Sequence, residues 1–326
     1  MDRKPTEYRR GLSSFCENAV VTPALEFREI SKRYGKLVAL DRLSLSVNPG
    51  EILGFVGPNG AGKTTAIHLA LGFLHATSGT GQMLGHEFGS PSSRVRLGFL
   101  PDAPTVFAGS ALDSALLAGR LNGVADRVLR ESAKDLLLSL NLPAEGRDAR
   151  QFSRGMQQRL GLAQALVNDP ELLILDEPTS ALDPPGVLQV REILRRARDA
   201  GKSVFFSSHQ LSEVEQLCDR VAFLHEGRLL RCGNLDALMK DASRTEVVIR
   251  GLGSGAAGMA PFAEFRIMTS QQDSEMRWVL PAEMGRRMIE AAWSAGGELQ
   301  TVAPLRRTLE ELFIEWTSDA SAKRHP

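Results

Sequence analysis

A glycine-rich run, GPNGAGKTT at residues 57–65, contains the residue types that most directly indicate chemistry. It fits the phosphate-binding pattern G-x-x-x-x-G-K-[ST], which ends here in Lys63 and Thr64. Glycines let backbone N–H groups surround phosphate oxygens without a Cβ in the way. The lysine can reach the β- and γ-phosphates, and the hydroxyl can hold Mg²⁺. We therefore predict a nucleotide-binding loop of Gly57, Pro58, Asn59, Gly60, Ala61, Gly62, Lys63, Thr64 and Thr65.

A second candidate is LLILDEP at residues 172–178, where four apolar residues predict a buried strand. Asp176 follows at the carboxyl end of that strand, where ligands bind in open α/β sheets. It can hold Mg²⁺ through Thr64 or a water. The next residue, Glu177, can polarise an attacking water as a general base. Taken alone, these two acids could instead be part of a solvated loop.

These residues need strands that end at one edge of a sheet. Residues 52–56 form a short apolar run before the glycine loop, and apolar residues at helical spacing follow Lys63. Downstream, the pattern alternates: strand 172–175, helix 184–198, strand 203–209, helix 211–218 and strand 220–225. Strands that alternate with helices predict a parallel sheet covered on both faces.

Other segments predict additional layers. Residues 25–30 and 43–47 alternate like strands with one wet face, and a further strand ends at Leu100. Residues 110–142 have helical periodicity and read as an insertion, followed by a helix over residues 154–167. The pattern changes near Asp241, with expected strands at 245–250, 263–268, 276–280 and 299–302 and expected helices at 281–295 and 308–316. This region reads as a small α+β unit.

Composition limits the class of protein. The 326 residues are 43% hydrophobic and 24% charged, which is ordinary for a globular protein. Lys+Arg and Asp+Glu both number 39, so a general basic field for nucleic acid is not expected. The three cysteines have no C-x-x-C spacing, which favours isolated thiols. No apolar run approaches a membrane span, and the N-terminus does not resemble a secretory signal.

Three segments together resemble the ATP-binding subunit of an ABC transporter, of the export type with a separate permease: residues 57–65, residues 172–177 and QFSRGMQQRLGLAQAL. The resemblance covers residues 25–238. It implies an α/β P-loop ATPase cassette, with a mixed sheet flanked by helices and a helical insertion, plus a small C-terminal α+β domain. The boundaries we expect are a flexible tail at 1–23, the ATPase domain at 24–240 and the accessory domain at 241–326.

The resemblance also implies roles for individual residues. FSRGM stands in the place of the family signature LSGGQ and keeps Ser153 and Gly155. In the family this helix N-terminus faces the γ-phosphate bound to the other subunit, so ATP is sandwiched in a homodimer of cassettes. Tyr34 occupies the place of an aromatic residue that stacks on adenine. Residues 180–183 look like the D-loop, and His209 matches the switch histidine, although a lone histidine is more often structural.

Two departures from the family pattern stand out. Arg154 and Met156 replace the usual glycine and glutamine of the signature, which implies a changed interface rather than lost function. Asp102 stands where the family has a glutamine that approaches Mg²⁺. An aspartate keeps an oxygen ligand, adds a charge and shortens the reach. The alternative is that Asp102 is a solvated turn residue before Pro104.

The resulting functional prediction is ATP hydrolysis that powers a separate transmembrane permease, with ATP and Mg²⁺ as cofactors. Lys63, Glu177 and His209 are the expected catalytic residues, and Thr64, Asp102 and Asp176 the expected metal ligands. The protein would lie on the cytoplasmic face of the membrane, with Val106 and Phe107 near a docked permease helix, unless both are buried in the insertion. The alternatives are a soluble ABC-type ATPase that acts on ribosomes or DNA, and an ATP-dependent regulatory switch.

Overall fold

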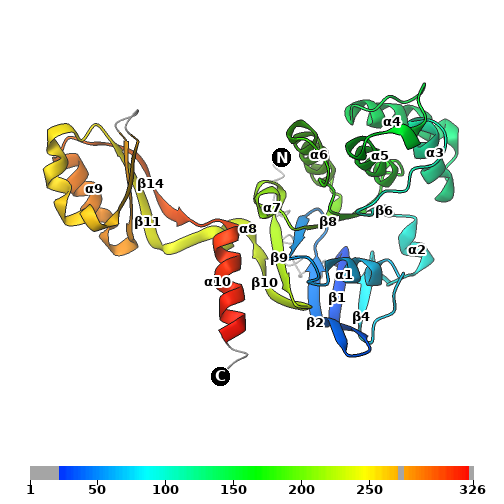
Figure 1. The fold of residues 1–326 in the computed structure, drawn as a ribbon, viewed down its shortest axis with the longest axis horizontal. Coiled ribbons are helices and arrows are strands. Elements are labelled where there is room, and N and C mark those ends of the chain that lie inside the picture. The colour runs from blue at the N-terminus through cyan, green and yellow to red at the C-terminus, as the bar shows by residue number, and fades with distance from the viewer. Residues whose placement is uncertain (1–21, 271–274, 323–326) are drawn as a thin grey trace, which may run out of the picture.

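The computed structural model describes residues 22–270 and 275–322, which form three β-sheets with helices around them (Figure 1). The tail predicted at residues 1–23 falls, up to residue 21, outside the described residues. Among the helices of the described segments, none combines the length and the apolar character needed to cross a bilayer.

The central sheet has six strands in the order β10-β9-β3-β8-β7-β6, and the strands from β9 to β6 run parallel. β3 (Ile52–Val56), β7 (Leu172–Asp176) and β8 (Ser203–Ser208) are buried along their whole length, as expected when both faces of a sheet are covered. The other strands are β6 (Leu97–Leu100), β9 (Arg220–His225) and β10 (Arg228–Asn234), which is antiparallel to β9. The carboxyl ends of β3, β8 and β7 therefore meet at one edge.

An antiparallel sheet lies against one face of this layer. Its order is β2-β1-β4-β5, with β1 (Leu25–Tyr34), β2 (Leu37–Val47), β4 (Ser78–Met83) and β5 (His86–Glu87). α1 (Lys63–Ala70) shares a core with both sheets, in which Phe27, Ile67 and Phe55 are buried. The predicted α/β class with a mixed sheet and flanking helices is confirmed. β4, β5 and β10 were not predicted, and β4 contains two glycines that obscure its pattern.

Helices cover the other face of the central sheet. The predicted insertion consists of α3 (Ala111–Leu121) and α4 (Asp126–Ser139), separated at Gly123, which has a φ of 81°. Ser110 and Asp113 cap α3 reciprocally, so two N–H groups at its first turn are satisfied. The remaining elements are α2 (Pro91–Arg94), the 3-10 helix η1 (Ala149–Gln151), α5 (Arg154–Leu166), α6 (Pro184–Asp199) and α7 (Leu211–Leu217).

A second antiparallel sheet, here called the accessory sheet, follows α8 (Leu235–Met239) and stands apart from the first two in Figure 1. Its order is β12-β13-β11-β14, with β11 (Lys240–Arg250), β12 (Arg266–Ser270), β13 (Glu275–Pro281) and β14 (Glu298–Arg306). α9 (Gly285–Ser294) and the 3-10 helices η2 (Gly253–Phe265) and η3 (Ala282–Met284) complete the unit. The strand predicted at residues 263–268 begins only at Arg266, because η2 runs to Phe265.

The last helix, α10 (Leu309–Ala322), does not pack on the accessory sheet. It packs against α7 and β10, next to the central sheet. Leu309 and Leu312 are buried in the same core as the central sheet. The ring of Phe313 stacks on Phe223 with centroids 6.1 Å apart, and Trp316 meets Phe223 edge-on at 4.9 Å. The structural unit built on the accessory sheet therefore ends near residue 306, and α10 completes the core of the first unit.

Candidate functional site

The glycine loop connects β3 to α1 at the edge where the parallel strands end. A Cβ on Gly57 would lie 2.2 Å from the carbonyl oxygen of Leu224. Gly62 is the N-cap of α1 and has a φ of 109°, a conformation that side-chain-bearing residues rarely adopt. The two glycines of the motif are therefore required by the local geometry, as well as by access to a phosphate.

A cavity of about 360 Å³ opens in front of this loop. It brings together segments that are far apart in the sequence, because β1, β3, β6 and β7 all end near it. Most of the predicted nucleotide and metal residues line it, whereas Gly57, Ser153, Gly155 and His209 do not. The lining residues are Tyr34, Leu37, Val38, Ala39, Pro58, Asn59, Gly60, Ala61, Gly62, Lys63, Thr64, Thr65, Asp102, Asp176 and Glu177.

Lys63 is the buried cation of the cavity. Its Nζ donates to the carbonyl oxygen of Gly57 at 2.7 Å and lies 3.9 Å from Glu177 Oε1. Burial lowers the pKa of this ammonium, while the negative charges of Glu177 and Asp176 oppose the shift. Carbonyl oxygens of the loop and the Glu177 carboxylate surround this charge. A phosphate would offer this ammonium a stronger partner than neutral carbonyl oxygens.

Asp176 is buried and is held by two hydroxyl groups. Thr64 Oγ1 donates to Asp176 Oδ2 at 3.2 Å, and Ser207 Oγ, on the neighbouring β8, donates to the other oxygen. Hydroxyl and carboxylate oxygens are the ligand types that Mg²⁺ takes in proteins, usually one or two beside phosphate and water. The oxygen donors that face the cavity therefore fit this metal. Ser207 was not predicted, because a lone serine in a strand gives no signal.

Glu177 is held at three points immediately after β7. Its N–H is 3.2 Å from Ser207 Oγ, and its carbonyl oxygen accepts from Gln158 Nε2 at 3.0 Å. Its carboxylate Oε2 lies 2.9 Å from His209 Nδ1, so the predicted base and the predicted switch histidine are in contact. The backbone of Glu177 has a φ of 52°, which is uncommon outside glycine and is found where surrounding structure fixes a functional residue.

Tyr34 and Asp102 lie at the rim of the cavity. Tyr34 is 45% exposed, and Lys32 Nζ lies 5.0 Å from the centroid of its ring, a cation–π contact. Enough ring surface is therefore exposed for a planar group to stack on it. Asp102 is exposed in the segment after β6 and is the lining residue that this segment contributes to the cavity.

Ser153 forms the N-cap of α5 and accepts from the N–H of Met156 at 3.3 Å. Gly155 lies on the same turn, where an added Cβ would come within 3.0 Å of the carbonyl oxygen of Ala181. The signature turn is thus packed against the segment predicted to be the D-loop. Since neither Ser153 nor Gly155 lines the cavity of its own chain, the structure does not bring these two together with Lys63.

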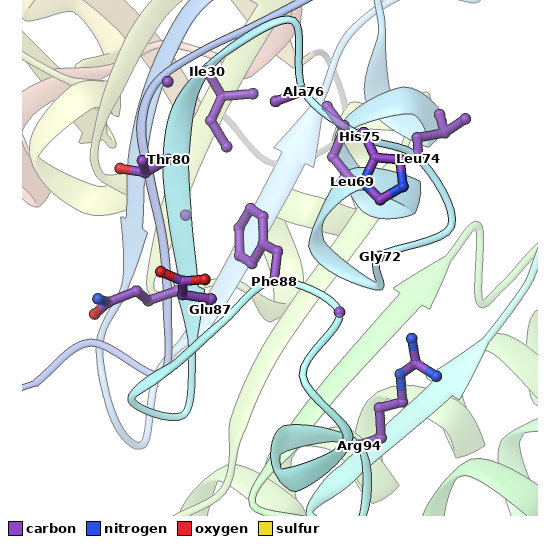
Figure 2. A pocket seen from close by; sticks show the side chains of 14 residues that line it. Ile30, Leu69, Gly72, Leu74, His75, Ala76, Thr80, Glu87, Phe88 and Arg94 are labelled. Carbon is purple, nitrogen blue, oxygen red and sulfur yellow. The ribbon is translucent and has the colours of Figure 1, made fainter.

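A second cavity, of about 600 Å³, shares no lining residue with the first. Figure 2 shows Phe88 between the strand that carries Thr80 and the loop that carries His75, with Arg94 at the far side. Its charged groups include both Glu87 and Arg94, and no predicted site residue reaches it. Size alone therefore does not identify the functional site, because the motifs converge on the smaller of the two cavities.

The sequence matches known proteins over most of its length. A family described as "ABC transporter" matches residues 40–180. The ATP-binding protein of an uncharacterized ABC transporter from Synechocystis sp. is 37% identical over 302 residues, covering 89% of this chain and 83% of that protein. The daunorubicin resistance ATP-binding protein DrrA3 of Streptomyces coeruleorubidus is 35% identical, covering 88% of this chain and 94% of that protein.

The fold gives the same assignment. A solved ATP-binding subunit of an ABC transporter superposes with a TM-score of 0.61 and 26% identity, over 66% of this chain and 91% of that chain. The sequence similarity extends over more of the chain than this structural overlap. The chain therefore belongs to the family of ABC transporter ATP-binding proteins, and it is an ATPase that binds ATP and powers transport by a membrane permease.

Proposed function

We propose that ATP binds with Mg²⁺ in the 360 Å³ cavity, between two copies of this cassette, and that its hydrolysis drives a separate export permease. One observation carries the proposal. Lys63, Thr64, Asp176 and Glu177, from two distant motifs, face the same cavity at the tips of β3 and β7. A phosphate chain against the glycine loop would meet a cation, a hydroxyl group and two carboxylates there.

Each group has a distinct task in this proposal. Lys63 and the loop N–H groups hold the β- and γ-phosphates, and the Tyr34 ring supports the adenine. Thr64 and Asp176, together with Asp102 from the segment after β6, would hold Mg²⁺ directly or through water. Bound there, Mg²⁺ would neutralise charge on the phosphate oxygens. The contact between Thr64 and Asp176 supports this, because both oxygens already converge.

Glu177 is the proposed general base. It takes a proton from a water as the water oxygen attacks the γ-phosphorus, while the bond from that phosphorus to the bridging oxygen breaks and ADP leaves. In this proposal His209 orients the Glu177 carboxylate through their 2.9 Å contact and donates a hydrogen bond to the γ-phosphate. The presence of both groups favours a turnover enzyme over a switch that only binds ATP.

The second copy would supply Ser153 and Gly155. Both lie outside the cavity of their own chain, on a helix N-terminus whose partial positive charge suits a phosphate. The N–H groups of this turn could reach the γ-phosphate from across a dimer interface. The proposed nucleotide site is therefore complete only between two cassettes.

The permease contact is proposed at the segment after Asp102, on the cytoplasmic face of the membrane. Phe107 is 40% exposed, whereas Val106 packs partly buried against the helical core. Phe107 is therefore the better candidate for an exposed anchor of a docked permease helix. A relative named for daunorubicin resistance supports export as the direction of transport.

Light scattering of a Glu177→Gln variant tests the sandwich. This change keeps the shape and removes the basicity, so the ATP-bound dimer should accumulate when ATP and Mg²⁺ are added. The double variant Lys63→Ala, Glu177→Gln is the matched control and should stay monomeric. A Glu177→Gln protein that remains monomeric at saturating ATP would contradict the dimer.

Membrane fractionation tests the docking segment. Phe107→Asp should release the protein from membranes that contain its permease and leave ATP hydrolysis in solution unchanged. Leu121→Asp is the control, since Leu121 is an even more exposed apolar side chain at the end of α3. Equal membrane association of both variants and the unaltered protein would refute this docking site.

A further inference from the structure

We propose that Thr179 and Glu213 are positioning residues for hydrolysis, and that the hydrogen bond between them keeps Glu177 in contact with His209. The Oγ1 of Thr179 donates to Oε2 of Glu213, and both side chains are only 6% exposed. This inference rests on the proposed roles of Glu177 and His209, and the experiment below separates its failure from theirs.

The bond joins the two turns that carry the proposed catalytic pair. β7 and β8 are neighbouring parallel strands, and Glu177 and His209 directly follow them. Thr179 is two residues beyond Glu177, and Glu213 is four residues beyond His209 in the first turn of α7. The two turns are thus linked twice: once by the contact between Glu177 and the half-exposed His209, and once in the interior by the bond from Thr179 to Glu213.

Helix α7 depends on such contacts for its position. It has seven residues, fewer than an isolated helix needs to be stable, and Gln210 at its N-cap makes no side-chain capping bond. On one side Val214 packs against Gly54 of β3, where an added Cβ would lie 2.7 Å from Val214 Cγ1. On another side the N–H of Leu309 in α10 donates to Glu215 Oε1 at 2.6 Å. Thr179 provides the link toward the catalytic turn.

The bond between Thr179 and Glu213 is a polar interaction of a buried carboxylate, so its loss costs more than the loss of an apolar contact. Within residues 22–270 and 275–322, the Glu213 carboxylate forms no ion pair. It accepts a hydrogen bond from the Thr179 hydroxyl group. A buried carboxylate that loses such a donor keeps its full desolvation penalty, so the turn and α7 must move to admit another partner. A general base must lie within hydrogen-bond reach of its water, and small displacements of such groups reduce turnover strongly.

Turnover measurements on Thr179→Val in the full-length protein test the inference. This change keeps the volume of the side chain and removes the hydroxyl. We expect kcat to fall by about 10- to 100-fold with the KM for ATP changed less than about twofold, because the phosphate-binding groups are untouched. Thr179→Ser restores the hydroxyl and should restore most of the activity. Ser114→Ala is the matched control, since it removes a buried hydroxyl that has no hydrogen-bond partner in the described part of the chain and lies far in the sequence from both turns.

A double-mutant cycle with His209→Ala separates positioning from general stability. If Thr179 acts through the Glu177–His209 contact, Thr179→Val should add little to the loss caused by His209→Ala. If Thr179→Val does not fold, Glu213→Gln gives the second test. That change keeps an acceptor oxygen but removes the charge, so kcat should fall by about fivefold in a folded protein.

Three outcomes have distinct meanings. Full turnover by Glu177→Gln and by His209→Ala would overturn the proposed catalytic pair. Loss in those two variants, with kcat for Thr179→Val and Glu213→Gln within twofold of the unaltered protein, would overturn only the positioning role. A loss in Thr179→Val that is fully additive with His209→Ala would also overturn it, because the bond would then act independently of the pair.

Discussion

The central sheet and the accessory sheet differ in how many of their faces are covered. β3, β7 and β8 are buried on both faces, so polar side chains can gather only where these strands end. The accessory sheet buries one face in a core with Val247, Trp278 and Met288, and its other, wetter face carries partly exposed charged side chains beside the buried Val279. Parallel strands covered on both sides thus concentrate polar chemistry at one edge, whereas an antiparallel sheet with one wet face disperses it.

The charged side chains follow this difference. In the cassette, Lys63 and Asp176 are 6% and 4% exposed and converge on the cavity. In the accessory sheet, Arg277 pairs with Glu246 across neighbouring strands, and about half of the arginine side chain is in solvent. Pairs of this kind keep a sheet face soluble and contribute little free energy. The comparison predicts that the two regions can be damaged separately.

The largest expected effect is on the accessory core. Trp278→Ala removes a side chain that is 1% exposed and should destabilise this unit by about 3–5 kcal/mol. ATP hydrolysis in solution should stay unchanged, because no residue of the accessory sheet lines the nucleotide cavity. Amide hydrogen exchange, measured separately for the two regions, should become faster in the accessory sheet and stay unchanged in the cassette. Trp278→Phe is the control, since it keeps a ring and removes an indole N–H that has no partner among the described residues.

Lys63→Ala should have the opposite effect: it should reduce ATP hydrolysis and leave the accessory sheet stable. Removing the ammonium should lower ATP hydrolysis by about 10²–10³-fold, because a fixed donor to the transferred phosphate is lost. Exchange rates in the accessory sheet should not change. Lys202→Ala is a suitable control, because that lysine pairs with Asp169 outside the cavity. If Lys63→Ala also loosened the accessory sheet, the two regions would be one cooperative unit.

Asp102→Ala should have a smaller effect that is specific to the metal. We expect the Mg²⁺ concentration for half-maximal activity to rise by about tenfold, with a smaller change in the KM for ATP. Asp102→Asn keeps one side-chain oxygen, so its Mg²⁺ concentration for half-maximal activity should lie between those of the unaltered protein and Asp102→Ala. Identical Mg²⁺ titrations for all three proteins would assign Asp102 to a solvated turn.

The smallest effect is expected on the wet face of the accessory sheet. Arg277→Ala breaks the pair with Glu246 and should cost about 0.2–1 kcal/mol, a loss that added salt reduces. The matching change in the cassette is Arg28→Ala, which breaks a similarly exposed pair with Glu26. A loss of several kcal/mol at Arg277 would mean that the wet face is buried against another surface.

The features that could be predicted from the sequence are those determined by residues close together in the chain. The glycine loop and the apolar strand before Asp176 depend on residues that are neighbours in the chain. Ser207 and Gln158 were missed because their importance arises only from contacts across the fold, to Asp176 and to the carbonyl oxygen of Glu177. The return of α10 was missed for the same reason, since an amphipathic helix does not specify which core it joins.

The ends of the accessory sheet have a consequence for how this protein could diversify. Lys240, which opens β11, pairs with Arg306, which closes β14, and the N–H of Arg307 donates to the carbonyl oxygen of Met239 at 2.8 Å. The chain therefore leaves and re-enters the cassette at one point, so the accessory sheet is an insertion that could be exchanged or excised in one piece. A stop codon at the same boundary would instead remove α10 and uncover Phe223, so shortening this gene from its end is far more damaging than shortening it from within.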